Sequence, residues 1–231
     1  NSKILTNRNV IERAKTALPY LLYDENAYTV IKDNQIYWVI DAYTISDKYP
    51  YSSYTTIDGE KEKRDINYIR NSVKVIINAY NGEMKFYIVD KTDPIISAYK
   101  KIYPAMFEEN DIPEEIQKQL KYPQLLYNVQ AETLRVYHNV KEDVLYRKSD
   151  IWSLATYGKS TSKTKTATLE PYYTMLKTPD GETRFGLVQM YTQKNKSNII
   201  SYVLGTCNGT SNELKIYKFL SIILFIRQNR S

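Results

Sequence analysis

The chain has 231 residues, of which 42% are hydrophobic and 25% charged, so it can bury a sizeable core and is not a disordered protein. Lysine and arginine exceed the acids by 32 to 26, but they are spread along the chain, so we do not expect binding to nucleic acid. The single cysteine excludes an internal disulfide, and no apolar run approaches the roughly eighteen residues that a membrane span needs.

An N-terminal helix and a β-hairpin are the first predicted elements. Val10, Ala14 and Leu18 share one face of a helix over residues 9–18. Residues 28–41 hold two runs of β-branched and aromatic residues around a polar turn at 33–34, which is typical of a hairpin. The chain begins on asparagine without a signal peptide, so we expect it to be a piece of a longer protein.

A second hairpin is predicted over residues 72–90. Its strands flank Asn81 and Gly82, and these residue types tolerate the positive φ angles of a type I′ turn. Each hairpin has one apolar face, so we expect the two to share a sheet or a core. Between them, residues 44–66 are rich in Tyr, Ser, Asp and Lys and predict a long loop, a kind of segment that is usually functional or mobile.

Residues 93–149 predict a block of helices. Asp93 and Pro94 suit the N-cap and the first residue of a helix. The apolar stripe of this helix is expected to be Ile95, Tyr99 and Ile102. Three more helices are expected to begin near Pro113, Tyr122 and Asn139.

The C-terminal part returns to strand patterns. Residues 157–168 are Lys, Ser and Thr without an apolar period, so we expect them to be poorly ordered. Residues 172–178 and 183–192 flank Pro-Asp-Gly and predict a third hairpin, whereas residues 197–205 fit a helix or a strand.

The predicted fold class is therefore α+β, with antiparallel β-hairpins in one or two sheets and an intervening helical block. We expect residues 1–231 to form one region, in which residues 1–92 are β-rich, 93–149 helical and 150–219 β-rich.

The common catalytic and metal-binding motifs are absent from the sequence. With one histidine and one cysteine, the chain cannot form a His-x-x-x-His zinc site or a Cys/His finger, and we expect no metal and no cofactor. A nucleophilic pair of Cys207 and His138 is conceivable. However, a histidine at the end of a helix more often binds the free carbonyls there, so we assign no catalytic residue.

Acidic and aromatic side chains near the first hairpin are the remaining candidates. Four aspartates at expected strand ends could supply an acid/base pair of the glycosidase kind, although aspartate there commonly caps turns: Asp41, Asp47, Asp90 and Asp93. Rings beside carboxylates suit sugar or peptide recognition, but aromatic residues in strands are more often core residues. The predicted binding site lies on the loop after the first hairpin and comprises Asp41, Tyr43, Asp47, Tyr49, Tyr51 and Tyr54.

Several longer motifs resemble those of one known family. They are QIYWVIDAYTISDKYPYS at 35–52, NYIRNSVK at 67–74, Asp93-Pro94, Tyr122-Pro123, Tyr137-His138, Asp150-Ile151-Trp152 and EPYY at 170–173. Together they are similar to the UPF0182 family of uncharacterised bacterial multi-pass membrane proteins. The resemblance ends near Phe219. Residues 220–226 are apolar where the family is polar and proline-rich, so we expect the tail at 220–231 to be non-native.

The resemblance implies a location and no activity, because the family offers no catalytic residues to carry over. Its members have several N-terminal transmembrane helices followed by a large region outside the cytoplasm, to which this chain corresponds. We therefore expect a region of a cell-membrane protein, attached through transmembrane helices that the chain lacks. The favoured function is non-catalytic binding of a partner protein or an envelope polymer. The alternatives are a carboxylate-dependent envelope hydrolase or transferase, and a polyanion-binding module with lysines gathered on one face.

Overall fold

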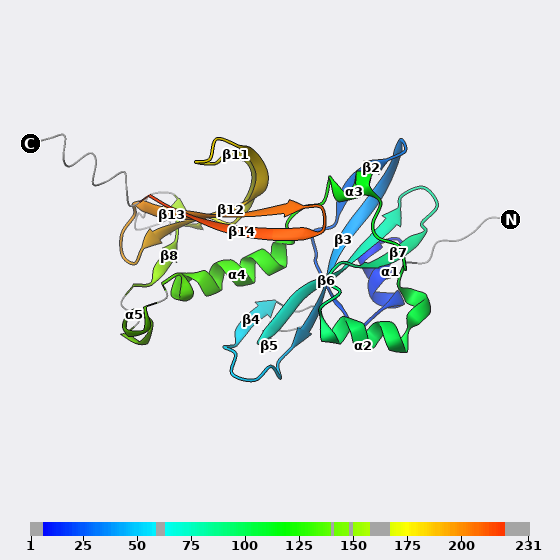
Figure 1. Cartoon of the computed structure of the whole chain (residues 1–231), viewed down its shortest axis with the longest axis horizontal. Helices are drawn as coiled ribbons and strands as arrows, with labels where there is room; N and C mark the ends of the chain where they lie inside the picture. The colour runs from blue at the N-terminus through cyan, green and yellow to red at the C-terminus, as the bar shows by residue number, and fades with distance from the viewer. Residues whose placement is uncertain (1–6, 59–62, 140, 148–149, 158–166, 220–231) are drawn as a thin grey trace, which may run out of the picture. The chain divides into compact units, whose positions relative to one another are not determined.

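The structure is a computed structural model that describes residues 7–58, 63–139, 141–147, 150–157 and 167–219 (Figure 1). It combines helices with antiparallel strands, which confirms the predicted α+β class. Residue contacts divide the chain into two compact units, Asn1–Leu126 and Tyr127–Ser231. The division falls inside the expected helical block, so residues 93–126 belong to the first unit.

The first unit is built on a five-stranded antiparallel sheet. Its strand order is β1-β3-β6-β7, and β2 also pairs with β3. The strands are β1 Leu22–Tyr23, β2 Tyr28–Lys32, β3 Gln35–Ser46, β6 Tyr68–Asn78 and β7 Met84–Ile88. The helices are α1 Val10–Ala17, α2 Pro94–Ile102, the 3-10 turn η1 Pro104–Met106 and α3 Glu114–Gln117, while α4 Gln124–Tyr137 begins before the division between the units. The two predicted hairpins therefore share one sheet, as expected.

The type I′ turn lies in the first hairpin. Asp33 and Asn34 have φ angles of 50° and 57°, and they form a two-residue connection because Lys32 pairs with Gln35. Positive φ at both central residues is the requirement of this turn, whose twist matches that of the strands.

The predicted type I′ turn at Asn81 and Gly82 is wrong. The φ of Gly82 is 73°, but the φ of Asn81 is not positive. The amide of Asn78 donates to the carbonyl of Glu83, so the connection has four residues. The Asn78 side chain accepts hydrogen bonds from the next backbone amides, those of Tyr80 and Asn81, at 2.8 and 3.2 Å, which stabilises this longer loop.

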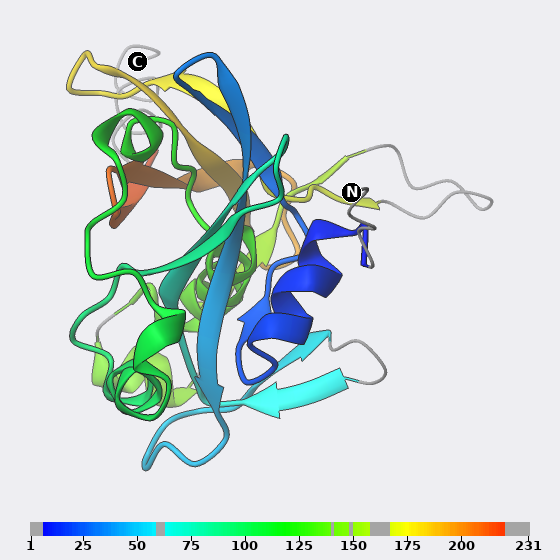
Figure 2. The ribbon, with the colours of Figure 1, turned by 90° about the vertical axis from the view of Figure 1, so that its right-hand side faces the viewer.

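The predicted long loop over residues 44–66 is largely strand, which corrects the prediction. Strand β3 continues to Ser46, which pairs with Tyr68 of β6. Beyond it, β4 Thr55–Asp58 and β5 Lys63–Ile66 form a separate antiparallel pair, drawn in cyan in Figure 2. We call residues 47–58 and 63–67 the tyrosine arm. Its strands have polar side chains on both faces, so the sequence carried no clear alternation.

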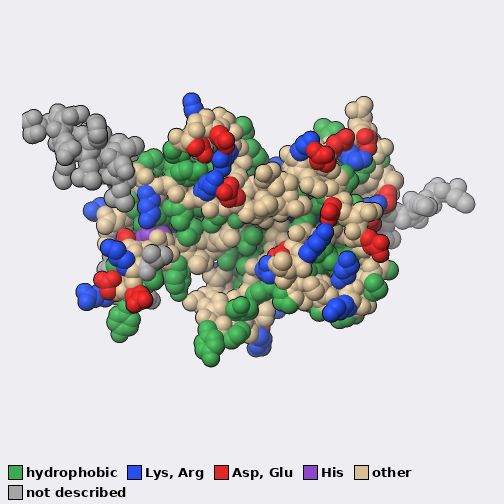
Figure 3. Space-filling model, in the orientation of Figure 1, with side chains coloured by type: hydrophobic (Ala, Val, Ile, Leu, Met, Phe, Trp, Pro, Cys, Tyr) green, Lys and Arg blue, Asp and Glu red, His purple; other side chains and the backbone are tan. Residues whose placement is uncertain are grey.

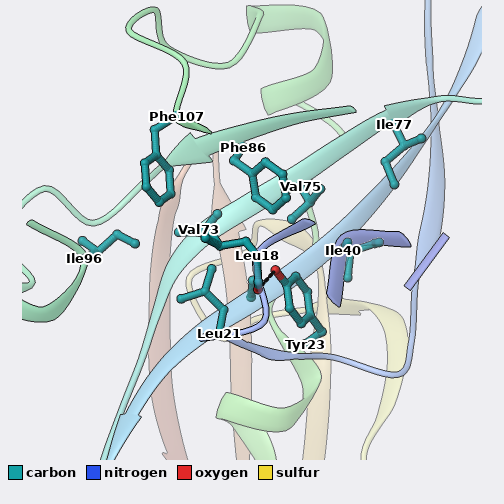
Figure 4. Close-up of a cluster of buried hydrophobic side chains, with 12 residues drawn as sticks. Leu18, Leu21, Tyr23, Ile40, Val73, Val75, Ile77, Phe86, Ile96 and Phe107 are labelled. Atoms are coloured by element: carbon teal, nitrogen blue, oxygen red, sulfur yellow. Dashed lines mark hydrogen bonds between the residues drawn. The ribbon is translucent and has the colours of Figure 1, made fainter. Parts of the chain in front are cut away.

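The apolar core lies on one face of this sheet. Val73, Val75 and Ile77 alternate along β6, and they cluster with side chains of α1 and α2 (Figure 4). The buried residue of α2 is Ile96, whereas Ile102 of the predicted stripe is exposed. The face of α2 that packs on the sheet is therefore centred on Ile96 and not on the predicted apolar stripe.

The outer edge of β2 is closed by a side chain. The amide group of Gln119 donates to the carbonyl of Ile31 at 2.7 Å and accepts from its N–H at 3.0 Å. Gln119 thus bonds to β2 as the backbone of a neighbouring strand would.

The second unit contains another five-stranded antiparallel sheet, in the order β11-β12-β13-β14 with β8 paired to β12. Its elements are α5 Glu142–Arg147, β8 Trp152–Leu154, β9 Thr156–Tyr157, β10 Ala167–Thr168, β11 Tyr172–Lys177, β12 Thr183–Gln193, β13 Ile199–Asn208 and β14 Ser211–Lys218. The third hairpin is confirmed as β11 and β12, and the ambiguous residues 197–205 fall largely in strand β13.

Two sequence predictions fall mainly outside the described residues. Most of the tract expected to be poorly ordered, residues 158–166, lies there, while its ends pair as β9 and β10. The tail at 220–231 also lies there. Among the helices that the structure describes, none is long and apolar enough to cross a membrane.

Candidate functional site

The six predicted binding residues lie in two different environments. Asp41 and Tyr43 belong to β3 and are 4% and 0% exposed. The other four follow the end of β3 on the tyrosine arm, where the three tyrosines are exposed and Asp47 is half-buried. The expected single loop surface over 41–54 is thus divided at Ser46.

Asp41 forms an ion pair with Lys74 on the face of the sheet opposite the apolar core. The two residues are direct neighbours across β3 and β6, and Lys74 is 0% exposed. Val73 and Val75, on either side of Lys74, point into the core, so the alternation of the strand places Lys74 on the other face. Each charge needs the other, because an isolated buried charge is strongly unfavourable.

Tyr43 extends this group of buried polar side chains. Its hydroxyl donates to Asp24 Oδ2 at 2.7 Å, and the same oxygen accepts from the backbone amide of Leu125 at 3.1 Å. Asn71 donates from Nδ2 to the carbonyl of Ala42 at 3.3 Å. We call this group the buried polar network; its members are Asp24, Asp41, Tyr43, Asn71 and Lys74.

Burial dominates the electrostatics of the network. It raises the pKa of Asp41, while the charge of Lys74 and hydrogen bonds from Lys74 and Asn71 act in the opposite direction. Burial also raises the pKa of the Tyr43 phenol well above its usual value, and the carboxylates of Asp41 and Asp24 add to this effect. The phenol therefore remains a hydrogen-bond donor at neutral pH.

The other candidate aspartates have structural partners of their own. Asp90 pairs with Arg70 at 2.6 Å. Asp93 is fully buried and caps α2, as the sequence indicates. Its carboxylate accepts hydrogen bonds from Thr44 and Ser72 at 2.5 Å, Tyr68 at 2.8 Å and the Ile95 amide at 2.9 Å. Both carboxylates thus have bonding partners within the fold.

Side-chain contacts within the tyrosine arm, and one ring contact with the sheet, hold the base of the arm in place. Asn67 accepts a hydrogen bond from the amide of Tyr49 at 3.0 Å and donates to its carbonyl at 2.7 Å. The ring of Tyr49 stacks on that of Tyr68, with centroids 5.5 Å apart, and Tyr68 donates to Asp93. The hydroxyl of Tyr54 donates to the carbonyl of Asp47 at 3.2 Å. The arm therefore has a fixed base.

Tyr51 is the most unusual residue of the arm. Its φ is 60°, a left-handed conformation that is rare for a bulky side chain, and the side chain is fully exposed. Such a conformation costs on the order of 1–3 kcal/mol. Packing of the ring does not offset this cost, so the fold itself does not account for a tyrosine here.

His138 and Cys207 bond to different partners. The ring nitrogens of His138 lie 3.0 Å from the carbonyl of Leu134 and 3.2 Å from Asp150, and the ring stacks on Trp152 at 3.7 Å. The thiol of Cys207 donates to the carbonyl of Gly209 at 3.0 Å. No group of three or more His, Cys, Asp or Glu side chains suited to a metal ion occurs within the described ranges.

The surface charge does not resemble a polyanion site on the side shown in Figure 3. Basic and acidic side chains are interspersed there. A polyanion-binding module would gather its lysines and arginines on one face.

Sequence reasoning missed the partners that hold both candidate regions together. Lys74, Asp24 and Asn71 complete the buried polar network, and Asn67 and Tyr68 anchor the arm. One signal was available, since Lys74 stands alone within the apolar run SVKVIIN and such a lysine requires a buried partner.

Fold and contacts together define an α+β protein whose first unit joins a buried polar network to an exposed tyrosine arm. A family model described as "Uncharacterised protein family (UPF0182)" matches residues 1–224. The chain belongs to this family, which confirms the resemblance noted in its motifs.

The relatives are much longer than this chain. A UPF0182 protein of Methanospirillum hungatei is 40% identical over 225 residues, which are 95% of this chain and 24% of the relative. A UPF0182 protein of Caldicellulosiruptor saccharolyticus is 41% identical, with the same coverage, and one of Clostridium tetani is 40% identical over 221 residues, 94% of this chain and 24% of the relative. The chain thus spans about a quarter of these curated relatives. No solved structure matches it.

Proposed function

We propose that this region is a non-catalytic binding module whose contact surface is the tyrosine arm. Tyr51 carries the proposal, because its ring is fully exposed at a backbone conformation that opposes a bulky residue. A residue kept under such conditions is more readily explained by a contact with another molecule than by the fold.

The neighbouring residues support a surface and not a pocket. Tyr49 and Tyr54 are exposed beside Tyr51, and the hydrogen bonds of Asn67 and Tyr54 hold the loop in place. Tyrosine offers a large amphipathic contact area and loses little side-chain entropy on binding, which makes it common at protein interfaces. We therefore assign a partner protein as the ligand of the arm.

We also propose where in the cell this binding takes place. The family resemblance implies a membrane-attached protein that exposes this region outside the cytoplasm, and an arm fixed at its base would reach partners in the cell envelope. An envelope polymer is the competing ligand, since exposed rings also stack on sugars.

Site-specific photo-crosslinking tests the proposal in the full-length protein. A benzophenone amino acid replaces Tyr51 or Tyr54 in one set of cells. The control set carries it at Tyr80, which is 68% exposed against 64% for Tyr54 but lies in the turn after β6. We expect one discrete protein adduct from the arm positions and none from Tyr80.

A second measurement is how much of the protein sediments together with cell-wall polymer. If the protein sediments with the polymer, if Tyr51→Ser abolishes this binding and if no protein adduct forms, the ligand is a polymer and not a partner protein. Equal adducts from Tyr80 and Tyr51, or neither adducts nor binding to the polymer, would contradict the proposal. The melting temperature of Tyr51→Ser should stay unchanged, because the ring makes no packing contact that the variant removes.

A further inference from the structure

Strand β14 forms one edge of the sheet of the second unit. It pairs with β13 along its whole length, and no hydrogen bond to its other edge occurs within the described part of the chain. The first unit differs in this respect, because Gln119 closes the outer edge of β2. An open edge strand can pair with a strand of another chain. This edge is separate from the tyrosine arm, and its argument is independent of the function proposed above.

The hydrogen bonds of β14 show which of its backbone groups face outward. The amide of Phe219, directly after the strand, donates to the carbonyl of Ile200 at 2.9 Å. Because bonded and non-bonded pairs alternate in an antiparallel ladder, the odd-numbered residues of β14 bond to β13. The even-numbered residues therefore direct their N–H and carbonyl groups away from the sheet. These residues are Asn212, Leu214, Ile216 and Lys218.

The side chains of β14 permit pairing along this edge. The strand contains no proline, and its pairing with β13 runs without a bulge, so two common ways of protecting an edge are absent from it. Leu214 is half-buried and Ile216 is 38% exposed, which leaves apolar surface beside the open backbone groups. Lysine also protects edges, but the charge of Lys215 is offset by Glu213, whose carboxylate lies 3.1 Å from its ammonium.

The charges of β14 favour one register for pairing with a second copy of the strand. An antiparallel two-fold pair centred on Leu214 places Glu213 of each copy opposite Lys215 of the other. Centred on Lys215 or on Glu213, the pair would place two lysines or two glutamates opposite each other. Opposite charges stabilise a cross-strand pair and like charges destabilise it. Glu213 already contacts Lys215 and Arg184 in its own chain, so these charges select the register and do not drive the association.

We propose that β14 is a dimerisation surface on which a second copy of this chain adds its own β14 in this register. Asn212, Leu214 and Ile216 of each copy each donate and accept one backbone hydrogen bond, and the two copies of Leu214 contact each other. The two sheets of the second units thereby become one continuous sheet. A two-fold contact uses the same surface on both copies, so the association closes at the dimer.

Sedimentation velocity of the 231-residue chain over a series of concentrations tests this surface. We expect an equilibrium between monomer and dimer. Lys215→Glu and Glu213→Lys each place like charges opposite one another, so each should weaken dimerisation about tenfold or more. Lys177→Glu is the matched control, because it makes the same charge change at an exposed position of β11, the strand at the other end of the strand order. This control should dimerise like the wild type.

A mixture of the two charge variants gives the sharpest test of the register. One variant carries glutamate at both positions and the other carries lysine at both, so the register centred on Leu214 pairs opposite charges in a mixed dimer. We expect dimers in the mixture at concentrations where each variant alone is a monomer. The double variant with Glu213→Lys and Lys215→Glu should also dimerise, because the exchanged charges are again opposite each other. Dimerisation through another surface predicts neither recovery.

Thermal unfolding of dilute samples checks that the variants fold. Their melting temperatures should match that of the wild-type monomer, because the side chains of Glu213 and Lys215 are 51% and 39% exposed and exposed ion pairs contribute little to stability. A wild-type chain that stays monomeric at every concentration would overturn the proposal. A dimer that both charge variants leave intact, or folded variants whose mixture forms no dimer, would overturn it as well.

Discussion

The buried polar network and the tyrosine arm differ in what holds their side chains in place. Asp41 and Tyr43 each bond to a residue distant in the chain, Lys74 and Asp24. A few residues later, Tyr51 has its ring in solvent. A polar group in the interior requires partners to be stable there, whereas an exposed ring requires none. The network therefore reports on folding, and the arm is free to serve binding.

The largest expected effect is that of breaking the ion pair of the network. Lys74→Met leaves the Asp41 carboxylate buried without its cation, which should lower the free energy of unfolding by about 3–5 kcal/mol. Urea denaturation measures this loss as a lower midpoint at an unchanged slope.

A second substitution distinguishes charge from packing in the same pair. Lys74→Met with Asp41→Asn removes both charges and should recover more than half of the loss. Lys118→Met, which removes an exposed partner of Glu114, should change stability little. A double variant as unstable as Lys74→Met alone would show that the pair acts through packing.

A smaller effect is expected at Asp93, the residue that links the sheet to the base of the arm. Burial alone would raise its pKa, but hydrogen bonds from Ser72, Thr44 and Tyr68 lower it below the usual value. The unfolded state therefore binds this proton more tightly than the folded state. The contribution of Asp93 is fully present above about pH 4, the range of an ordinary aspartate, and is lost as the pH falls through the lower folded pKa.

Acid unfolding of Asp93→Asn checks this sign. At neutral pH the variant should lose about 1–3 kcal/mol, because the hydroxyls lose a charged acceptor. Below pH 4 its stability should fall less steeply than that of the wild type. Parallel acid limbs for the two proteins would mean that Asp93 titrates normally.

The smallest expected effect concerns the arm. Tyr51→Asn places a residue that tolerates positive φ at this position, so the melting temperature should stay unchanged or rise by about 2 °C. Partner crosslinking from Tyr54 should nevertheless be lost. A clear drop in melting temperature would show that the Tyr51 ring supports the fold, and the contrast between network and arm would then fail.

Patterns among neighbouring residues predicted most helices and strands, whereas contacts between residues far apart in the sequence determine which side chains are buried. Alternation and capping, as at Asp93, depend on neighbouring residues and were visible in the sequence. The partner of Asp41 lies 33 residues away on another strand, and this contact decides that Asp41 is buried. The turn of the second hairpin has four residues because the side chain of Asn78 binds the backbone amides that follow it. The preference of Asn-Gly for a two-residue turn takes no account of such a side-chain contact.

The environment of the candidate site residues was predictable only in part, for the same reason. Exposure of Tyr49, Tyr51 and Tyr54 follows from a polar segment, whereas the length of β3 and its bulge between Ala42 and Thr44 follow from pairing with β6.

The contact of Gln119 with the edge of β2 bears on aggregation of the protein. The hairpin of β2 and β3 exposes Ile31 and Ile36, and an uncovered strand edge beside apolar side chains is a template for aggregation. The Gln119 amide already occupies the outward N–H and carbonyl of Ile31. A strand from another copy would have to displace it before it could extend the sheet at Ile31, so this one side chain opposes edge-to-edge association there.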